Sequence, residues 1–312
     1  MLGNADAVGY PVGVAARPRA RRRAWGTAAR PWLYLAPAFL IYVLFWVGPA
    51  AYSLYLSFFD WDMVSPQKTF VYLDNYRRVL ADPVFRVSLL NTVVYVGATV
   101  LLATSIGLGL ALLIQSRRRG REVYRFVVFM PVVTSITVIA LIWLFLFNTQ
   151  VGVLNQTLAL LGVAGPNWLN SPATALLAIV LVSVWKGFGY NVILFTAGLD
   201  GIDRQLYEAA ALDGAGRWGA FRHVTWPLLG PVTLFVVVVG VIASFQVFAT
   251  VQIMTRGGPA NATNVLVYHI WEAAFRFFDV GYAAALATLL ALLVGGLTVL
   301  QIRRGEAHVH YQ

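Results

Sequence analysis

The chain has 312 residues, of which 59% are hydrophobic and 12% charged, with a mean hydropathy of +0.72. Soluble domains carry roughly 25% charged residues, so an ordinary soluble globular protein is excluded and a membrane protein is indicated. The absence of cysteine and the scarcity of histidine argue against thiol catalysis, disulfide frameworks and metal sites. The net charge of +10 suggests nucleic acid, but basic residues in a hydrophobic chain are more often cytoplasmic anchors.

Six apolar stretches are long enough to cross a hydrocarbon core, which takes roughly 20 residues per helix. We therefore predict an all-α membrane protein with six transmembrane helices, near residues 32–59, 87–114, 124–147, 173–199, 229–250 and 283–301. Prolines such as Pro131 and several glycines fall inside these stretches. They are expected to bend helices or to let them pack closely.

The basic residues are distributed unevenly around this 32–302 membrane domain. With the N-terminus inside, 16 of the 23 Lys and Arg fall on inside segments and 6 on outside segments. Because short basic loops stay in the cytoplasm, both termini and the connection 200–228 are predicted to be cytoplasmic. Residues 1–31 are expected to be a disordered basic tail and residues 303–312 a C-terminal tail. The simpler explanation of the basic tail is that its arginines keep the N-terminus in the cytoplasm and so fix the topology. Attraction to anionic membrane lipid is the alternative.

The connection 200–228 is patterned like folded structure. It predicts a helical run from Arg204 to Leu212, a glycine-containing turn at 213–216, and a second run from Arg217 to Thr225. Pro227 is expected to end that run and to start the next span. Six of the nine residues at 208–216 are Ala or Gly. Small side chains allow another protein's backbone to approach closely, so this loop is expected to be a docking element.

The residues of this loop resemble a known motif. Glu208-Ala209-Ala210, Gly214 and Val224-Thr225-Trp226-Pro227 are similar to the EAA motif, EAA-x3-G-x9-I-x-L-P. That motif is found in the membrane subunits of binding-protein-dependent ABC importers. The surrounding residues resemble the carbohydrate branch, related to the maltose and glycerol-3-phosphate systems.

Other stretches support the same resemblance. Leu73-Asp74-Asn75-Tyr76 resembles the start of the family's core, with Tyr72 where the family commonly has Gly. Trp185-Lys186-Gly187 and the following residues resemble its fourth core span, after which Asp203 stands where Pro is common.

The resemblance implies the fold of a type I ABC importer permease, in the bacterial cytoplasmic (inner) membrane. The implied partners are a second permease subunit in a pseudo-symmetric heterodimer, two ATP-binding subunits and an extracytoplasmic solute-binding protein. The implied solute is an oligosaccharide, a polyol or a glycerol-3-phosphate-type compound. The chain contains no Gly-Lys pair and therefore no phosphate-binding Walker A loop. We expect no enzymatic activity and no bound cofactor, with ATP used by partner subunits, and no nucleic-acid partner.

By resemblance, the loop couples the membrane domain to the ATPases. The residues expected to do so are Glu208, Ala209, Ala210, Asp213, Gly214 and Pro227. Glu208 would contact the ATPase or hold the loop, the alanines would permit close seating, and Gly214 would supply the turn. The alternative for Glu208 is a solvated helix face or an ion pair with Arg204.

Polar groups at membrane depth are costly and therefore usually functional or paired. The solute-pathway candidates are Asn91, Trp185, Lys186, Tyr190, Asn191, Phe245 and Gln246, with the aromatic rings as stacking faces for a sugar. Lys186 would contact solute or pair with a carboxylate of a partner subunit, and ordinary packing is the alternative for the aromatics. Gly257-Gly258-Pro259 predicts a turn, which by resemblance faces the binding protein.

Two other classes of protein compete with this hypothesis. A secondary transporter would show internal repeats and a coupling-ion site, and neither is visible in the sequence. A membrane-embedded transferase would use clustered acidic residues. Asp200, Asp203, Glu208 and Asp213 are the only support for it.

Overall fold

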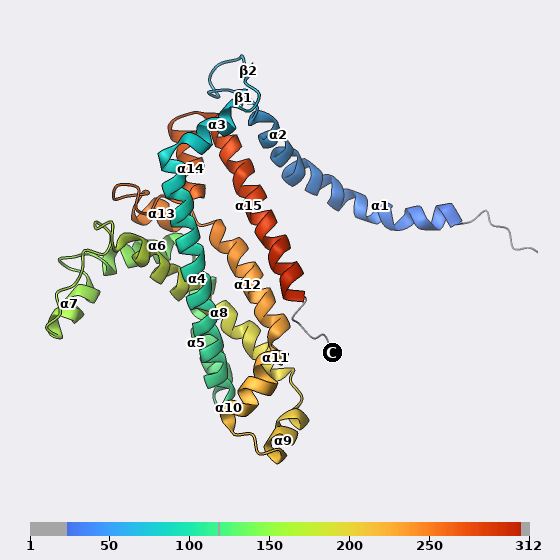
Figure 1. Cartoon of the computed structure of the whole chain (residues 1–312), viewed down its shortest axis with the longest axis vertical. Helices are drawn as coiled ribbons and strands as arrows, with labels where there is room; N and C mark the ends of the chain where they lie inside the picture. Colours follow the sequence, from blue (N-terminus) through green and yellow to red (C-terminus); the bar gives the residue numbers. More distant parts are fainter. Residues whose placement is uncertain (1–23, 118, 307–312) are drawn as a thin grey trace, which may run out of the picture. The chain divides into compact units, whose positions relative to one another are not determined.

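A computed structural model describes residues 24–117 and 119–306 (Figure 1). The predicted basic tail up to residue 23 and the C-terminal tail from residue 307 lie outside this part of the chain. The chain divides into two compact units, residues 1–52 and residues 53–312.

The first unit is helical throughout its described part. Helix α1 (Ala24–Tyr42) continues through a π-helical turn (Val43–Val47) into α2 (Gly48–Leu56). Tyr34–Leu56 is long and apolar enough to cross a membrane, and none of its most apolar window is buried. A helix that is apolar on all sides needs lipid or another protein around it. Disorder was expected as far as residue 31, whereas the helix begins at Ala24, in an alanine-rich stretch that favours helix.

The second unit is a helical bundle with one small β ladder. The ladder pairs β1 (Phe59–Asp60) with β2 (Thr69–Phe70) in antiparallel register. The helices are α3 (Asp74–Ala81), α4 (Pro83–Gln115), α5 (Arg121–Val133), α6 (Ile136–Leu146), α7 (Val153–Leu160), α8 (Ala175–Asp200), α9 (Arg204–Leu212), α10 (Arg217–Ala220), α11 (Trp226–Leu228), α12 (Gly230–Phe245), α13 (Ala249–Met254), α14 (Leu266–Trp271) and α15 (Val280–Glu306), with π-helical turns at Phe221–Thr225 and Glu272–Arg276.

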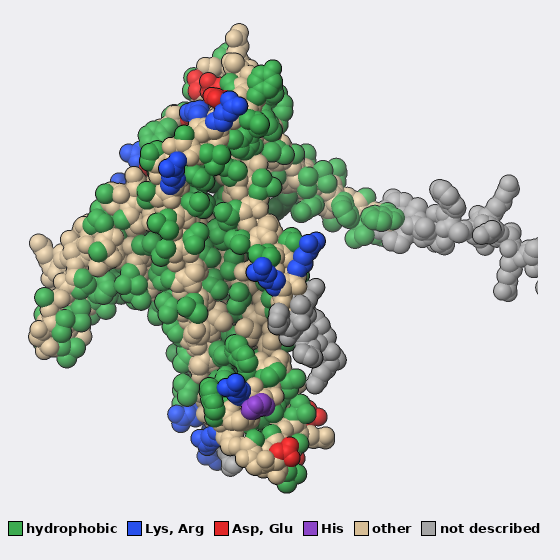
Figure 2. Space-filling view, viewed as in Figure 1, with side chains coloured by type: hydrophobic (Ala, Val, Ile, Leu, Met, Phe, Trp, Pro, Cys, Tyr) green, Lys and Arg blue, Asp and Glu red, His purple; other side chains and the backbone are tan. Residues whose placement is uncertain are grey.

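The predicted membrane spans correspond to helices. In the described residues, four helices are long and apolar enough to cross a membrane, and two bent helix pairs raise the number to six. On the face in Figure 2, acidic side chains lie near α3 and near α9, at opposite ends of the bundle, and mainly hydrophobic side chains cover the helices between them. This distribution is the one that a hydrocarbon layer around the middle of the bundle requires.

Two predicted spans are not straight. The pair α5 and α6 bends by 94°, because Thr134 and Ser135 between them have extended backbone. We call residues 134–135 the break. The segment Arg217–Leu228 bends by 61° against α12. Pro227 was expected to end the run from Arg217 and to start the next span. It lies at the start of the short helix α11, where a proline's missing N–H is tolerated, and α12 begins at Gly230.

The long helix α4 packs most extensively against α8. A methyl group added to Gly107 would come within 2.6 Å of Asn191 Cβ, and one added to Gly189 within 2.2 Å of the Val128 carbonyl oxygen. Glycine at these two positions therefore allows the close helix contacts on which the bundle depends.

The stretch that resembles the start of the family core has a structural role. The buried Asn75 donates from Nδ2 to the carbonyls of Ser57 (3.0 Å) and Phe59 (2.9 Å), and Tyr76 pairs with the Ser57 hydroxyl at 2.7 Å. Tyr72 adopts a positive φ of 52°. A left-handed backbone favours glycine, the residue common at this position in the family that the stretch resembles.

Candidate functional site

The loop between α8 and α12 begins with a capped helix. Asp203 is the N-cap of α9, and its carboxylate accepts a hydrogen bond from the Gln205 N–H at 2.9 Å. Aspartate is a strong N-cap residue because its side chain satisfies one of the free N–H groups of the first turn. Asp203 therefore starts the helix, at the position where the resembled family often has proline.

Helix α9 ends in a left-handed turn. The Asp213 N–H donates to the Ala209 carbonyl (3.0 Å) and the Ala215 N–H to the Ala210 carbonyl (2.9 Å). Gly214 between them has φ +79°. Glycine is the residue that adopts this conformation without strain, so the predicted helix–turn–helix and the turn at Gly214 are both present.

The alanine-rich side of this turn is open to solvent. Glu208, Ala209, Asp213 and Gly214 are exposed, and Ala210 is half-buried. Neighbouring Leu212 is 90% exposed and Trp218 is 71% exposed. Large exposed hydrophobic side chains beside small residues are typical of an interaction surface.

Glu208 makes no ion pair with Arg204 in the part of the chain that the structure describes. Of the two alternatives to a coupling contact, the internal pair is therefore absent from the described structure, and the solvated helix face stays open.

The second half of the loop is braced against the first. The Tyr207 hydroxyl lies 3.0 Å from the hydroxyl of the buried Thr225. Trp218 stacks on Phe221 at 5.4 Å, and Trp226 lies 6.3 Å from the same ring. Trp226, which replaces the family's Leu, thus extends an aromatic row along this face.

The acidic residues of the loop do not form a common site. The Asp200 carboxylate accepts from Arg125 Nη2 at 2.7 Å and from Gln115 Nε2 at 2.9 Å. Asp203 is engaged as a helix cap. No group of three or more acidic or histidine side chains able to hold a metal occurs in residues 24–117 and 119–306. Of the four acidic residues that supported a transferase, Asp200 and Asp203 are engaged in separate structural contacts, and Glu208 and Asp213 are exposed.

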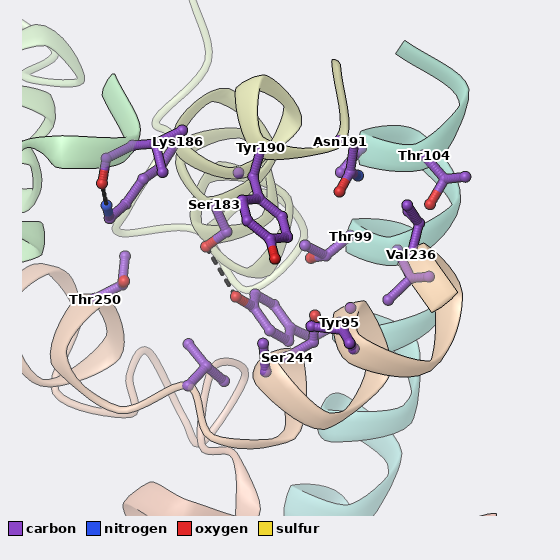
Figure 3. A pocket seen from close by; sticks show the side chains of 18 of the residues that line it. Tyr95, Thr99, Thr104, Ser183, Lys186, Tyr190, Asn191, Val236, Ser244 and Thr250 are labelled. Atoms are coloured by element: carbon purple, nitrogen blue, oxygen red, sulfur yellow. Dashed lines mark hydrogen bonds between the residues drawn. The ribbon is translucent and has the colours of Figure 1, made fainter. Parts of the chain in front are cut away.

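A cavity of about 340 Å³ lies between α4, α8, α12 and the break. This central cavity has the size of small-molecule sites, which span roughly 300–1,000 Å³. Its polar lining is rich in hydroxyl groups (Figure 3). They belong to Tyr95, Thr99, Thr104, Ser183, Tyr190, Ser244 and Thr250, and Asn191 adds an amide. The Tyr95 hydroxyl donates to Ser183 Oγ at 2.8 Å and so joins α4 to α8.

Three predicted pathway residues, Lys186, Tyr190 and Asn191, line this cavity. The others lie elsewhere. Trp185 packs against Trp143 at 5.6 Å, Phe245 is in the hydrophobic core at 3% exposure, and Gln246 is exposed at the end of α12.

Sequence reasoning missed the hydroxyls of α4 and α12. The signal for two of them was their spacing, because Tyr95 and Thr99 are four residues apart and share one helix face. Single Ser and Thr residues inside an apolar helix otherwise look like packing residues.

Lys186 reaches from the middle of α8 to the break. Its Nζ donates to the carbonyls of Val132 at 3.0 Å and Thr134 at 3.2 Å. Figure 3 shows the Lys186 side chain with one of these hydrogen bonds. Sequence reasoning offered a solute contact or a carboxylate of another subunit for this ammonium. Its partners in the structure are backbone carbonyls of the same chain.

Asn91 lies on α4 beside the predicted outer loop. Its Nδ2 donates to the carbonyls of Asn261 (2.8 Å) and Asn264 (2.9 Å). The loop contains the predicted turn, with Gly257 at φ +76° followed by a cis Gly258-Pro259 bond. A side chain at Gly257 would also meet the Tyr268 ring at 2.7 Å. Asn91 thus holds this turn against α4.

The family model "binding-protein-dependent transport system inner membrane component" matches residues 103–304. This range contains the loop, the turn at Gly257 and most of the residues that line the central cavity, whose lining begins at Tyr95.

Curated relatives match over most of the chain. It is 37% identical over 277 residues to the probable ABC transporter permease protein YurN of Bacillus subtilis, covering 88% of this chain and 94% of that protein. It is 36% identical over 282 residues to the sn-glycerol-3-phosphate transport system permease protein UgpA of Brucella abortus, covering 90% and 96%.

Solved structures share the fold. A chain of a bacterial ABC transporter involved in the import of the acidic polysaccharide alginate superposes with a TM-score of 0.80 at 21% identity, covering 92% of this chain and 99% of that one. A second structure of a bacterial alginate ABC transporter, in complex with an alginate pentasaccharide-bound periplasmic protein, gives 0.78 at 21% identity, covering 90% and 96%.

These matches confirm the predicted family, the permease fold and the location in the bacterial inner membrane. ATP is used by partner subunits and not by this chain, and the family requires no cofactor. The chain belongs to the inner membrane components of binding-protein-dependent transport systems, as a permease of a carbohydrate- or glycerol-3-phosphate-type ABC importer.

Proposed function

We propose that the loop 200–228 is the element that couples this permease to ATP hydrolysis by its partner subunits. The complex contains a second permease as a pseudo-symmetric partner, two ATP-binding subunits and an external solute-binding protein. Both termini and the loop lie in the cytoplasm, and the turn at Gly257–Pro259 lies on the outer face. Membrane lipid surrounds the spans.

The observation that carries this proposal is the exposed turn at Gly214. Glu208 and Ala209 are exposed to solvent, while a hydrogen bond between the hydroxyls of Tyr207 and Thr225 braces the helix behind them. A braced helix with an open small-residue face moves as a rigid body when a partner grips it, which is what a domain-closure transition needs.

The central cavity is this chain's part of the solute pathway in the same proposal. Hydroxyl and amide groups on several helices match the hydroxyls of a sugar or polyol, and the Tyr190 ring offers a stacking face. The UgpA relatives are glycerol-3-phosphate permeases by name, so a glycerol-3-phosphate-type solute is also among the proposed solutes.

The experiment for the loop is purification of the tagged chain in detergent, followed by reconstitution. Co-purification of an ATPase and a second permease is expected. Glu208→Ala and Gly214→Asp should lower uptake per ATP hydrolysed or dissociate the ATPase. A chain that purifies alone and transports without any ATPase would overturn the proposal.

The cavity has its own test, a size series at Gly187. A side chain there would extend into open space, since no heavy atom lies within 4 Å of its added Cβ. The solute is first identified as one whose uptake is lost when the chain is deleted. Gly187→Ala should preserve its uptake and Gly187→Trp should abolish it in an assembled complex. Full uptake by Gly187→Trp would remove this cavity from the pathway.

A further inference from the structure

Lys186 connects the wall of the central cavity to the break between α5 and α6. Its aliphatic stem belongs to α8 and lines the cavity, while its ammonium donates to the carbonyls of Val132 and Thr134. These carbonyls lie at the end of α5, where the last turn of any helix has no N–H partners of its own.

The break makes it energetically costly to leave those carbonyls without hydrogen-bond partners. Because the chain turns by 94° after α5, α6 does not continue the same hydrogen-bond ladder. Backbone carbonyls without partners at membrane depth are strongly unfavourable, and broken spans survive only where other groups satisfy them. The positive charge of Lys186 also interacts favourably with the partial negative charge at the C-terminal end of α5.

We propose that Lys186 is a positioning residue for transport, which fastens the break to α8 so that the bend of α5 and α6 follows α8 through the ATPase cycle. The proposal rests on the chain working within an ATP-driven importer. It assigns the ammonium a role in the protein's own geometry, where sequence reasoning had offered a solute or another subunit.

The chain itself supplies the controls. Tyr190 lies one turn further along α8 and lines the same cavity, but the structure gives it no hydrogen bond to the break. Tyr190→Phe therefore removes a cavity hydroxyl and leaves the fastening intact. The chain contains no cysteine, so Ser135→Cys at the exposed break introduces a unique thiol in this subunit.

The experiment measures maleimide labelling of Ser135→Cys in the complete importer in proteoliposomes. Rates are compared without nucleotide and with ATP and vanadate, which hold the ATPases closed. We expect the two states to label at different rates in the parent and in Tyr190→Phe. Lys186→Met, which loses both charge-assisted hydrogen bonds, should label at least roughly tenfold faster without nucleotide, since tenfold already corresponds to the loss of one such bond. It should also lose the difference between states. Lys186→Arg should restore it.

A general structural defect would not be rescued by Arg and would lower basal ATPase activity, which is measured in parallel. If Lys186→Met does not assemble, Lys186→Gln, with a shorter amide donor, should give an intermediate rate and response. Equal labelling rates for Lys186→Met and the parent in both nucleotide states would overturn the proposal. Equal rates in the two nucleotide states for the parent itself would also overturn it. Failure of the proposed pathway appears elsewhere, as uptake that survives Gly187→Trp.

Discussion

Arg125 Nη2 on α5 lies 2.7 Å from Asp200 Oδ2, at the last residue of α8. Gln115 at the end of α4 donates to the other oxygen of the same carboxylate. Asp200 therefore connects the ends of three helices four residues before α9 begins at Arg204. If the loop couples to the ATPases as proposed, this carboxylate would connect its movement to all three helices.

Asp200→Asn should lower the midpoint of thermal unfolding of the purified complex and reduce uptake per ATP. The expected loss is about 1 kcal/mol, because the pair is partly exposed and charge-assisted. The control is Glu122→Gln, whose carboxylate lies 3.7 Å from the same arginine with 90% of its side chain exposed. An equal effect of both substitutions would argue against a specific role for Asp200.

The turn at Gly214 predicts a difference between two neighbouring glycines. Neither has an atom within 4 Å of an added Cβ, but only Gly214 has a positive φ. Gly214→Ala should destabilise the turn by about 1 kcal/mol through backbone strain and lower uptake. Gly216→Ala, at φ −71°, should have the smaller effect. Uptake by the two variants in the same vesicles is the measurement, and equal uptake would contradict the argument.

A second glycine pair tests the packing at the start of α15. A methyl group on Gly281 would lie 1.9 Å from the Phe59 carbonyl oxygen, whereas Gly295 on the same helix has open space. Gly281→Ala should cost about 2 kcal/mol or more, and Gly295→Ala should be neutral or stabilise by roughly 0.5–1 kcal/mol. Unfolding midpoints that fall equally would show that the contact at Phe59 relaxes freely.

Acidification should weaken the end of the bundle near α14. Burial lowers the pKa of His269, although the nearby Asp82 carboxylate opposes this. The unfolded chain therefore binds a proton more readily, and stability falls as the pH drops below about 6.5. Burial raises the pKa of Asp82, but hydrogen bonds from the Tyr282 hydroxyl and the Val84 N–H outweigh burial, so the pKa of this carboxyl lies below its ordinary value. Asp82 thus stays ionised in this window.

The measurement is the unfolding midpoint at pH 7.5 and at pH 5.5. His269→Gln, which has no titration in this range, should reduce the difference between the two. A difference that is unchanged in the variant would assign the acid sensitivity to other groups.

The spans and the loop were predictable because they depend on local patterns. Apolar length located the helices, and the spacing of Glu208 and Gly214 located the turn. The break was only indicated, since Pro131 marks a weak point three residues before it.

The partners of Lys186 could not be predicted, because they depend on a bend that hydropathy does not reveal. The cavity hydroxyls could not be predicted either, because they lie on helices that come together only through packing. The contacts of Asn91 could not be predicted for a related reason, because its partners lie 170 and 173 residues away in a loop.

The most direct test of the central claim is a cross-link from Ala209→Cys. Ala209 is exposed on α9 and the chain has no other thiol. In the complete importer, a short thiol-directed cross-linker should join this position to an ATP-binding subunit, with a yield that changes on addition of ATP. Leu160→Cys, at a position 87% exposed on α7, should not react with that subunit. Failure of Ala209→Cys to capture an ATP-binding subunit in an assembled, active complex would contradict the assignment of the loop.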